Sequence, residues 1–354
     1  MKRTGNLYGD ICDFKNLLRA ARTAQKGKRF KAGCREFNLD LEKNLLTIQQ
    51  ELRDGTYRPG AYRHFRVHEP KERIISAVPY RDRVVHHALM NVIAPLFDRS
   101  MIYDSYANRD GKGTHRALDR FTAFSRKNRY VLKMDVKKYF ENIDHAILMG
   151  MVERKIKDRD VLRLVGLIVA SGCHPDGNAP LRYFSGDDLF TPLTRKRGLP
   201  IGNLTSQSFA NVYLNAFDHY VKEHLNCRYY IRYMDDMAVF SDSKGYLREI
   251  RRAMIDKLSE LRLRVHENRA QYWPVDCGTD WLGFRVYPTH RRVRKSGIKR
   301  CKKRLRHLSE AYRDGCVPLD RVTLSVRSWI AHASHADSYR LRERIMKEFV
   351  FQRG

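Results

Sequence analysis

Cysteine is scarce in this sequence and follows no metal-binding or disulfide pattern. Only seven cysteines occur among 354 residues, and no two of them form a Cys-x-x-Cys pair. Cys173 is followed by His174, but no second pair matches it. An odd, unpatterned set of cysteines argues against a zinc site and against a disulfide framework. We therefore expect reduced thiols, as in a cytoplasm.

A long apolar segment is also missing. The first six residues carry no apolar signal core, and the apolar run at 161–173 is short and includes Arg163. Neither stretch has the length or composition of a membrane span. The sequence predicts no membrane anchor, and it contains no internal repeat or long linker.

Acidic residues are few beside the basic ones. The chain has 40 Asp and Glu against 69 Lys and Arg, a formal net charge of +29. Solubility does not require this excess, whereas a nucleic-acid partner explains it through counterion release. A generally basic surface or an anionic membrane is the alternative, but no amphipathic lipid-binding helix stands out. An apolar content of 42% excludes wholesale disorder, and the length suggests two or three subdomains.

Two acidic strand ends are the most informative feature. At 229–240, two runs of aromatic and aliphatic residues flank Asp235 and Asp236, which predicts a hairpin with both aspartates at its tip. Such a pair is usually only a turn. A second predicted strand, 130–135, ends in Asp135 about a hundred residues earlier. Three carboxylates on adjacent strand ends can hold two Mg²⁺ ions about 3.5–4 Å apart, the arrangement that nucleotidyl transfer needs.

These residues resemble the catalytic motifs of reverse transcriptases. Residues 233–236 resemble the palm hairpin of that family, and residues 135–140 resemble its first catalytic strand. The resemblance implies an α+β right-hand polymerase with fingers, an antiparallel palm sheet and a helical thumb. It places the fingers at 1–128, the palm at 129–288 with an interleaved fingers segment at about 146–200, and the thumb at 289–354. By resemblance, the catalytic residues and ligands of two Mg²⁺ ions are Asp135, Asp235 and Asp236.

The nucleotide site is expected on three segments. Residues 62–78 predict two strands around a charged turn, and in the family this hairpin grips the incoming triphosphate. Solvated turn charges are the alternative there. By resemblance, Phe140 excludes a ribose 2′-hydroxyl, although a core aromatic has the same signature. The glycine-proline loop at 197–203 suits a platform under the nascent base pair. The nucleotide-binding candidates are Lys71, Arg73, Phe140, Ile201 and Gly202.

Contacts to template and primer are expected from four further segments. The glycine-punctuated basic loop at 106–115 matches a template-contacting segment, although Gly-x-Gly is a weak signal. The family holds the primer end with the hairpin that 281–286 resembles. Residues 289–308 contain ten Lys and Arg and no acidic residue, and predict a basic thumb helix along the nucleic-acid backbone. The template and primer candidates are Arg109, Lys112, Ser206, Gln207, Gly283, Lys299, Lys302 and Lys303.

The loop before the helix at 204 bears on the subfamily. Most reverse transcriptases carry glutamine before Gly202 and a Ser-Pro later, whereas this chain has Ile201 and then Ser206 and Gln207. This combination resembles the reverse transcriptases of diversity-generating retroelements, whose cDNA synthesis is error-prone at template adenines. An apolar, β-branched side chain cannot donate the hydrogen bonds of an amide, which is consistent with loosened nucleotide control.

That resemblance also implies partners and a setting. The implied partners are template RNA, the RNA/cDNA duplex, dNTPs and a small, basic, oligomeric accessory protein. The implied location is the cytoplasm of a prokaryotic or phage-infected cell. The rivals are a group II intron-like, retron-like or phage-defence reverse transcriptase, and a non-catalytic RNA-binding protein. Phe140 disfavours an RNA polymerase or terminal transferase. The chain after the palm is too short for an RNase H domain, and no Cys/His cluster indicates a zinc endonuclease.

Helices are expected around these motifs. Two helices joined by a basic loop at 26–29 account for residues 11–53, and further helices are predicted at 80–97, from about 114, at 146–157 capped by Asp144, after 202, at 244–264 and in the last thirty residues. The least regular part is 171–197, read as a loop or small hairpin. His86 and His87 point about 100° apart on a helix, which favours packing or RNA contact over a shared metal. The family's proton-donating lysine is missing; Arg269 aligns best and His266 is the better acid, so the leaving-group acid stays open.

Overall fold

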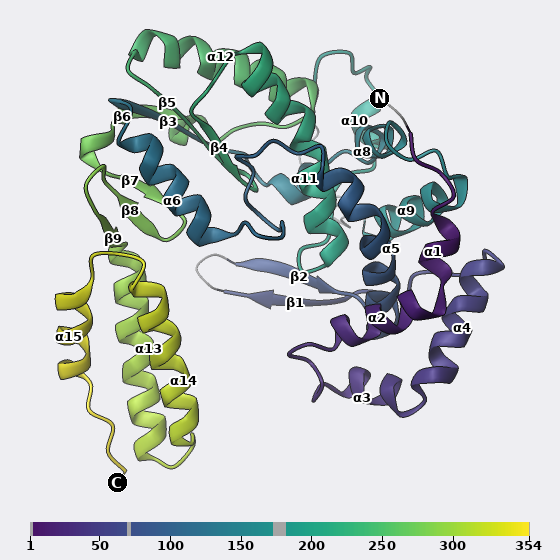
Figure 1. Ribbon diagram of the computed structural model, residues 1–354, viewed down its shortest axis with the longest axis horizontal. Coiled ribbons are helices and arrows are strands. Elements are labelled where there is room, and N and C mark those ends of the chain that lie inside the picture. The colour runs from purple at the N-terminus through teal and green to yellow at the C-terminus, as the bar shows by residue number, and fades with distance from the viewer. Residues whose placement is uncertain (1–2, 69–71, 173–181, 354) are drawn as a thin grey trace.

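The computed structural model describes residues 3–68, 72–172 and 182–353 (Figure 1). Its α-helices are α1 (Tyr8–Cys12), α2 (Phe14–Ala24), α3 (Ala32–Leu39), α4 (Leu41–Arg53), α5 (Tyr80–Asp98), α6 (Thr114–Ser125), α7 (Tyr139–Asn142), α8 (His145–Glu153), α9 (Arg159–Ser171), α10 (Thr191–Thr194), α11 (Leu204–His219), α12 (Lys244–Glu260), α13 (Lys295–Arg313), α14 (Leu319–Ala333) and α15 (Tyr339–Glu348). Its strands are β1 (Arg63–Val67), β2 (Arg73–Ala77), β3 (Tyr130–Asp135), β4 (Tyr230–Tyr233), β5 (Asp236–Ser241), β6 (Gln271–Pro274), β7 (Thr279–Trp281), β8 (Phe284–Val286) and β9 (Arg291–Val293).

A four-stranded antiparallel sheet in the order β4-β5-β3-β6 carries the acidic strand ends. Alternate residues of β3 enter two different cores because successive side chains of a strand point to opposite faces. Leu132 and Met134 share a core with α12, whereas Val131 packs with Phe121 of α6. Figure 1 shows α12 and α6 on opposite sides of this sheet. The sheet is thus covered on both faces, and its strand ends are left open for chemistry.

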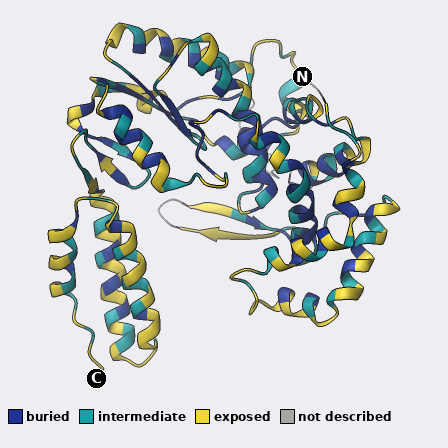
Figure 2. Cartoon of the chain, viewed as in Figure 1, coloured by how far each residue is buried: buried dark blue, intermediate teal, exposed yellow. Residues whose placement is uncertain are grey.

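Helix α5 runs through the largest core of the molecule. Its buried residues recur at helical spacing, among them Val85, Ala88, Leu89 and Ile93. It packs against α2 on one side and against α11 on another. Both α5 and α11 consist largely of buried residues, coloured dark blue in Figure 2, and the N-terminal helices and the central sheet share one hydrophobic core.

The N-terminal region contains four helices where the sequence predicted two. Asp13 ends α1 and caps α2, because its side chain accepts a hydrogen bond from the amide of Asn16. Asp40 leaves the helical conformation between α3 and α4, with φ −118° and ψ 49°. The basic loop at 26–29 was predicted correctly, and Leu39 at the end of α3 is 83% exposed although it falls at an apolar position of the helical spacing. Hydrophobic spacing alone therefore missed two aspartate breaks.

The N-terminal segment is fixed to a part of the chain far along the sequence. Thr4 forms a parallel bridge with Ile156, through backbone hydrogen bonds of 2.7 Å to Lys155 and 2.8 Å from Lys157. The carboxylate of Asp158 accepts hydrogen bonds from the amides of Leu7 and Tyr8, at 2.8 and 3.1 Å. These contacts join α1 to the connection between α8 and α9.

The C-terminal part consists of a small sheet and three helices. Strands β7, β8 and β9 form an antiparallel sheet, and α13, α14 and α15 extend below it in Figure 1. The predicted basic helix at 289–308 is wrong at its start, because β9 precedes α13 and residue 294 caps the helix. The predicted helix at 244–264 ends at Glu260, and Arg262 has φ +56°. Leu305 of α13 and Ile345 of α15 are buried together.

Most of the remaining predictions of elements agree with the structure within the described residues, but the helix predicted at 146–157 ends at Glu153. The two strands at 62–78, the helix at 80–97, the helix start at 114 and the Asp144 cap are all confirmed. Part of the irregular segment 171–197 lies outside the described residues, and the short helix α10 occupies part of the rest. None of the described helices has the length and apolar character to cross a membrane. The mixed helices and antiparallel sheet form the expected right-hand polymerase fold, while the proposed subdomain boundaries stay a prediction.

Candidate active site

Two strand ends bring the three predicted catalytic aspartates together. Asp135 is the last residue of β3 and Asp236 is the first of β5, and the two are partners in the strand register. Tyr233 of β4 also pairs with Asp236, so the turn consists of Met234 and Asp235 alone. The predicted hairpin exists, but Asp236 already belongs to the strand rather than to the tip. One carboxylate therefore lies in the turn and two lie on facing strand ends.

Burial and neighbouring charges raise the pKa values of Asp235 and Asp236. The pKa of Asp235 is raised to about 6, first by burial and then by the charges of Asp236 and Asp135, while Arg73 opposes the rise. Burial also raises the pKa of Asp236, and Lys133 lowers it. Like charges held close together favour either protonation or a bound cation. The site thus has the electrostatics of a cation-binding centre.

Two side chains of this protein already place positive charge on the site. A guanidinium nitrogen of Arg269 lies 3.1 Å from Asp135, and the ammonium of Lys133 lies 3.3 Å from Asp236. As these side chains stand, the described part of the chain contains no group of three or more His, Cys, Asp or Glu that could hold a metal ion. Three carboxylates on two strand ends are suitable ligands for a divalent cation. Binding of the cation requires Arg269 and Lys133 to move away from Asp135 and Asp236.

The β1–β2 hairpin presents its basic exit to the aspartates. Arg73 is exposed at the start of β2, and its charge is a minor influence that opposes the rise in the pKa of Asp235. The guanidinium therefore lies within electrostatic range of the catalytic turn, and its contact with a triphosphate stays a prediction. Lys71, the other predicted grip on the triphosphate, lies outside the described residues.

The two aromatics that follow Asp135 take different positions. Tyr139 is fully buried, and its hydroxyl donates a hydrogen bond to the carbonyl of Ala210. Phe140 is only partly buried beside it, with ring centroids 5.7 Å apart. Its carbonyl accepts a 2.7 Å hydrogen bond from the amide of Leu199. Tyr139 is thus the core aromatic, and Phe140 stays the candidate for sugar selection.

The loop with Ile201 and Gly202 docks on the hairpin. The backbone amide of Ser76 in β2 donates to the carbonyl of Ile201 at 3.1 Å, and the side-chain Nδ2 of Asn203 donates to the carbonyl of Ser76 at 3.2 Å. Gly202 has φ +113°, and an added Cβ would lie 3.0 Å from a methyl of Ile75. Gly202 thus brings the loop close to β2, and its place under the nascent base pair stays a prediction.

The two candidates in the loop 106–115 are engaged within the chain. Arg109 donates to Asp98 at 2.5 Å and to the carbonyls of Ile102 and Ser105 at 2.7 and 3.0 Å. Its side chain is only 9% exposed, so this geometry favours a structural role over a template contact. Lys112 donates to the carbonyl of Tyr103 at 2.8 Å and lies over that tyrosine ring. Template contact by either residue remains a prediction without support from their present partners.

The candidates on α11 and on the primer hairpin differ in exposure. Ser206 is buried and Gln207 is partly exposed on the first turns of α11. Gly283 lies in the turn between β7 and β8 with φ +91°, and His332 of α14 approaches its open side. The His332 ring also packs on Phe284, with centroids 4.6 Å apart. The turn predicted to hold the primer end is therefore braced by the C-terminal helices.

Helix α13 separates its apolar and basic residues cleanly. Cys301, Leu305 and Leu308 are buried, whereas Lys299 and Lys303 are exposed on the other side. Lys302 is half-buried and forms an ion pair with Glu348 of α15. The basic face predicted from the sequence is present, and one of its three candidate lysines is already neutralised.

The residues considered for proton transfer lie beside the first aspartate. The amide of His266 donates to the carbonyl of Asp135 at 2.9 Å, and Arg269 pairs with its carboxylate. Which group protonates the leaving pyrophosphate stays open. His86 is buried, and burial lowers its pKa to about 3, which confirms packing as its role. The described cysteines are all free, and Cys173 lies outside the described residues.

The sequence analysis overlooked two basic residues that support the aspartates. Lys133 in β3 donates to the carbonyl of Asp280 at 3.1 Å in addition to its pair with Asp236, and so connects the catalytic strand to β7. Arg232 in β4 is fully buried and pairs with Asp218 of α11. Both interrupt otherwise apolar strands, Lys133 two residues before Asp135 and Arg232 three residues before Asp235, and that interruption was the available signal.

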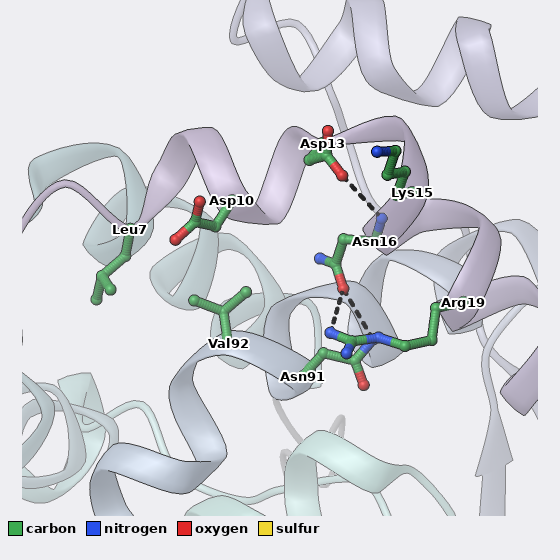
Figure 3. A pocket seen from close by; sticks show the side chains of 8 residues that line it. All are labelled: Leu7, Asp10, Asp13, Lys15, Asn16, Arg19, Asn91 and Val92. Carbon is green, nitrogen blue, oxygen red and sulfur yellow. Dashed lines mark hydrogen bonds between the residues drawn. The ribbon is translucent and has the colours of Figure 1, made fainter.

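A polar pocket of about 550 Å³ lies elsewhere, between α1, α2 and α5 (Figure 3). Its amides bond within the protein, since Asn16 accepts from both Arg19 and Asn91. None of the three aspartates lines it. The pocket is therefore separate from the candidate active site, and Asn16, Arg19 and Asn91 in its lining bond to one another.

The chain is similar in sequence to several known proteins. Protein YkfC of Escherichia coli is 28% identical over 188 residues, which cover 51% of this chain and 45% of that protein. The group II intron-encoded protein LtrA of Lactococcus lactis is 25% identical over 183 residues, covering 51% of this chain and 28% of that protein. The matched region thus spans less than half the length of these relatives. A telomerase from Candida albicans, solved with a fragment of telomeric RNA, aligns with a TM-score of 0.42 and 11% identity over 70% of this chain and 50% of its own.

The family model described as reverse transcriptase (RNA-dependent DNA polymerase) matches residues 67–286. That range begins in β1, contains all three aspartates and ends with β8. On this match, the chain belongs to the reverse transcriptase family.

Proposed function

We propose that this chain is an RNA-directed DNA polymerase that extends a primer on an RNA template with dNTPs. The observation that carries the proposal is the pairing of Asp135 with Asp236 across β3 and β5, with Asp235 in the adjoining turn. Family membership supports it, and divalent-metal dependence follows from the chemistry of nucleotidyl transfer. The net charge of +29 is consistent with a nucleic-acid substrate.

Each described residue then has a task. Asp135, Asp235 and Asp236 would hold two Mg²⁺ ions, which lower the pKa of the attacking hydroxyl and stabilise the leaving group when bound. Arg73 would bind the triphosphate, and Phe140 would exclude a 2′-hydroxyl. The primer 3′-oxygen forms a bond to the α-phosphorus, the bond to the bridging oxygen breaks, and pyrophosphate leaves. Lys71 is proposed for the triphosphate as well, from the resemblance alone.

We further propose that the template comes from a diversity-generating retroelement. The support is Ile201 in place of glutamine, at a loop whose backbone is fixed to β2. This assignment brings with it adenine-directed errors and a small, basic, oligomeric accessory protein. A group II intron-type enzyme is the second candidate, favoured by the similarity to a group II intron-encoded protein.

Primer extension on a defined RNA with four dNTPs and Mg²⁺ tests the proposal, with Asp235→Asn measured beside the wild type. DNA made only by the wild type supports polymerase activity, and sequencing the products separates the two candidates. Errors concentrated opposite template adenines support the retroelement enzyme, whereas accurate cDNA supports the intron type. Equal products from wild type and Asp235→Asn would contradict the catalytic assignment. The reaction is repeated with the accessory protein and the native RNA of the element, so that dependence on them is detected.

A further inference from the structure

The turn that carries Asp235 has an unusual backbone. Met234 has φ +57°, a left-handed conformation that costs a residue with a side chain about 1–2 kcal/mol. Such conformations persist where the surrounding structure fixes them, and they gather at functional sites. The residue after it, Asp235, bonds through its carbonyl to the amide of Val136, at 3.3 Å. The conformation of Met234 thus determines how the turn meets the strand end at Asp135.

The contact that fixes this turn comes from Arg232. One terminal nitrogen of its guanidinium donates to the carbonyl of Met234 at 3.0 Å and to the side-chain oxygen of Asn211 at 3.1 Å. The other donates to Asp218 at 2.6 Å and to the hydroxyl of Ser105 at 3.2 Å. The Nε atom donates to Asp218 at 2.7 Å. All five N–H donors of the guanidinium are therefore used.

The position of Arg232 is fixed by complete burial and by hydrogen bonds to its side chain and backbone. Arg232 and Asp218 are both 0% exposed, and Asp218 also accepts a 2.7 Å hydrogen bond from the hydroxyl of Tyr230. The backbone of Arg232 pairs with residues 104 and 106, at 3.0 and 3.1 Å. Helix α11, strand β4 and the loop before α6 thus converge on one guanidinium, and that guanidinium holds the catalytic turn.

A buried ion pair of this kind is a costly way to stabilise a core. Apolar residues of similar volume are often as stable, so the pair points to a geometric task. Resting on the proposed function, we propose that Arg232 is a positioning residue that sets the Met234 carbonyl and thereby holds the Asp235 carboxylate in register with Asp135 for a divalent cation. Lysine at this position could pair with Asp218, but its ammonium lacks the fork needed to reach Met234 and Asn211 as well.

The decisive experiment compares Arg232→Lys with the wild type in the full chain. Binding of Mn²⁺ to the free protein is followed by electron paramagnetic resonance, without nucleotide or RNA. We expect the Mn²⁺ dissociation constant to rise about 10- to 100-fold, as for other residues that orient metal ligands. In primer extension, kcat should fall by a similar factor, while KM for dNTP and the affinity for RNA stay within about threefold of the wild type.

The matched control is Arg120→Lys. Arg120 pairs with Asp104 at 2.7 Å in the same part of the molecule but does not contact the catalytic turn. Its Mn²⁺ affinity should equal that of the wild type. An Arg232→Lys protein that binds Mn²⁺ as tightly as the wild type would overturn the proposal. A variant in which RNA affinity falls and KM for dNTP rises by the same factor as the Mn²⁺ dissociation constant would also overturn it, because such a change indicates a purely structural role.

Asn211→Ala keeps the inference testable if Arg232→Lys does not fold. This variant retains the buried ion pair and removes one partner of the nitrogen that bonds Met234. A weaker Mn²⁺ affinity supports the proposal, and an unchanged one overturns it. The binding measurement also distinguishes failure of the proposed polymerase function from failure of the inference about Arg232. A wild type that binds Mn²⁺ through the Arg232-dependent site without extending a primer would contradict the proposed function and leave the inference standing.

Discussion

At the scale of single residues, two of the three proposed catalytic carboxylates form ion pairs with basic side chains of the same chain. Arg269 holds Asp135 from the segment that follows α12, and Lys133 holds Asp236 from within β3. Asp235 has no such partner within hydrogen-bonding distance among the described residues, and its pKa is the one raised to about 6. Because Asp235 lacks such an ion pair in the described part of the chain, its replacement by asparagine is expected to change the free energy of unfolding.

Asp235→Asn should stabilise the metal-free protein at pH 7.5. A carboxyl whose pKa rises from 3.8 in the unfolded chain to about 6 in the fold binds its proton more tightly when folded. Its ionisation therefore lowers stability as pH rises through about 4 to 6, and the full penalty is present above pH 6. Allowing for partial solvent exposure, we expect a gain of about 1–2 kcal/mol.

Thermal unfolding with a chelator at pH 7.5 and pH 5 measures this gain, which should shrink at pH 5. The exposed carboxylate of Asp256 on α12 offers a control, Asp256→Asn, in which little change is expected. A variant that unfolds earlier than the wild type at pH 7.5 would contradict the electrostatic account. The same Asp235→Asn protein should bind RNA normally while failing to extend a primer.

Ile201→Gln should lower the error rate of cDNA synthesis. An amide can hydrogen-bond the incoming nucleotide where an isoleucine cannot, and the backbone of residue 201 is already fixed by Ser76. Sequencing of products on a defined RNA measures the effect, expected to be severalfold and largest at template adenines. Ile201→Val retains an apolar, β-branched side chain and should keep the wild-type spectrum. Equal fidelity of Ile201→Gln and Ile201→Val would remove the argument for this residue.

At the scale of elements, the site depends on how the 198–203 loop is docked on β2. Gly202→Ala combines strain at φ +113° with a Cβ placed 3.0 Å from Ile75. We expect the loop to shift from the hairpin that carries Arg73, which raises KM for dNTP about three- to tenfold, equivalent to roughly 1 kcal/mol.

The control for that change is Gly186→Ala, which has φ +87° and no atom within 4 Å of the added Cβ. It carries backbone strain without the contact, so its KM should be unchanged. Steady-state extension with varied dNTP distinguishes the two. A rise of KM in both variants would attribute the effect to general destabilisation.

Elements with their own local signals were predictable from the sequence. Runs of aromatic and aliphatic residues predicted β3, β4 and β5, and Asp144 predicted the start of α8. The breaks at Asp13 and Asp40 were missed, because hydrophobic spacing continues across them. The internal use of Arg109 was equally hidden, since pairing with Asp98 depends on tertiary packing rather than on the sequence nearby. Buried partners of charged residues are the part of a site that a sequence reveals least.

At the scale of the whole molecule, the charge of +29 predicts strongly salt-dependent binding. Each Lys or Arg that neutralises a phosphate contributes about 0.7–0.9 to the slope of log affinity against log salt. Lys299→Gln and Lys303→Gln should each lower the slope by about that amount. Lys302→Gln should change it less, because Lys302 is paired with Glu348.

Fluorescence anisotropy of an RNA/DNA duplex between about 50 and 200 mM salt measures these slopes. Lys302→Gln is the matched control, one turn away on the same helix α13. Equal slopes for all three variants and the wild type would exclude this face of α13 from the nucleic-acid interface.

The attachment of Thr4 to residues 155–157 has a consequence for synthesis on the ribosome. The amide of Leu7 finds its acceptor in Asp158, 151 residues further along the chain. At about 5–20 residues per second, roughly 8 to 30 seconds separate the emergence of these two partners. During that interval the amides of Leu7 and Tyr8 lack their acceptor, and the segment around them stays accessible to chaperones. Residues 4–8 can therefore dock only after the start of α9 has been synthesised.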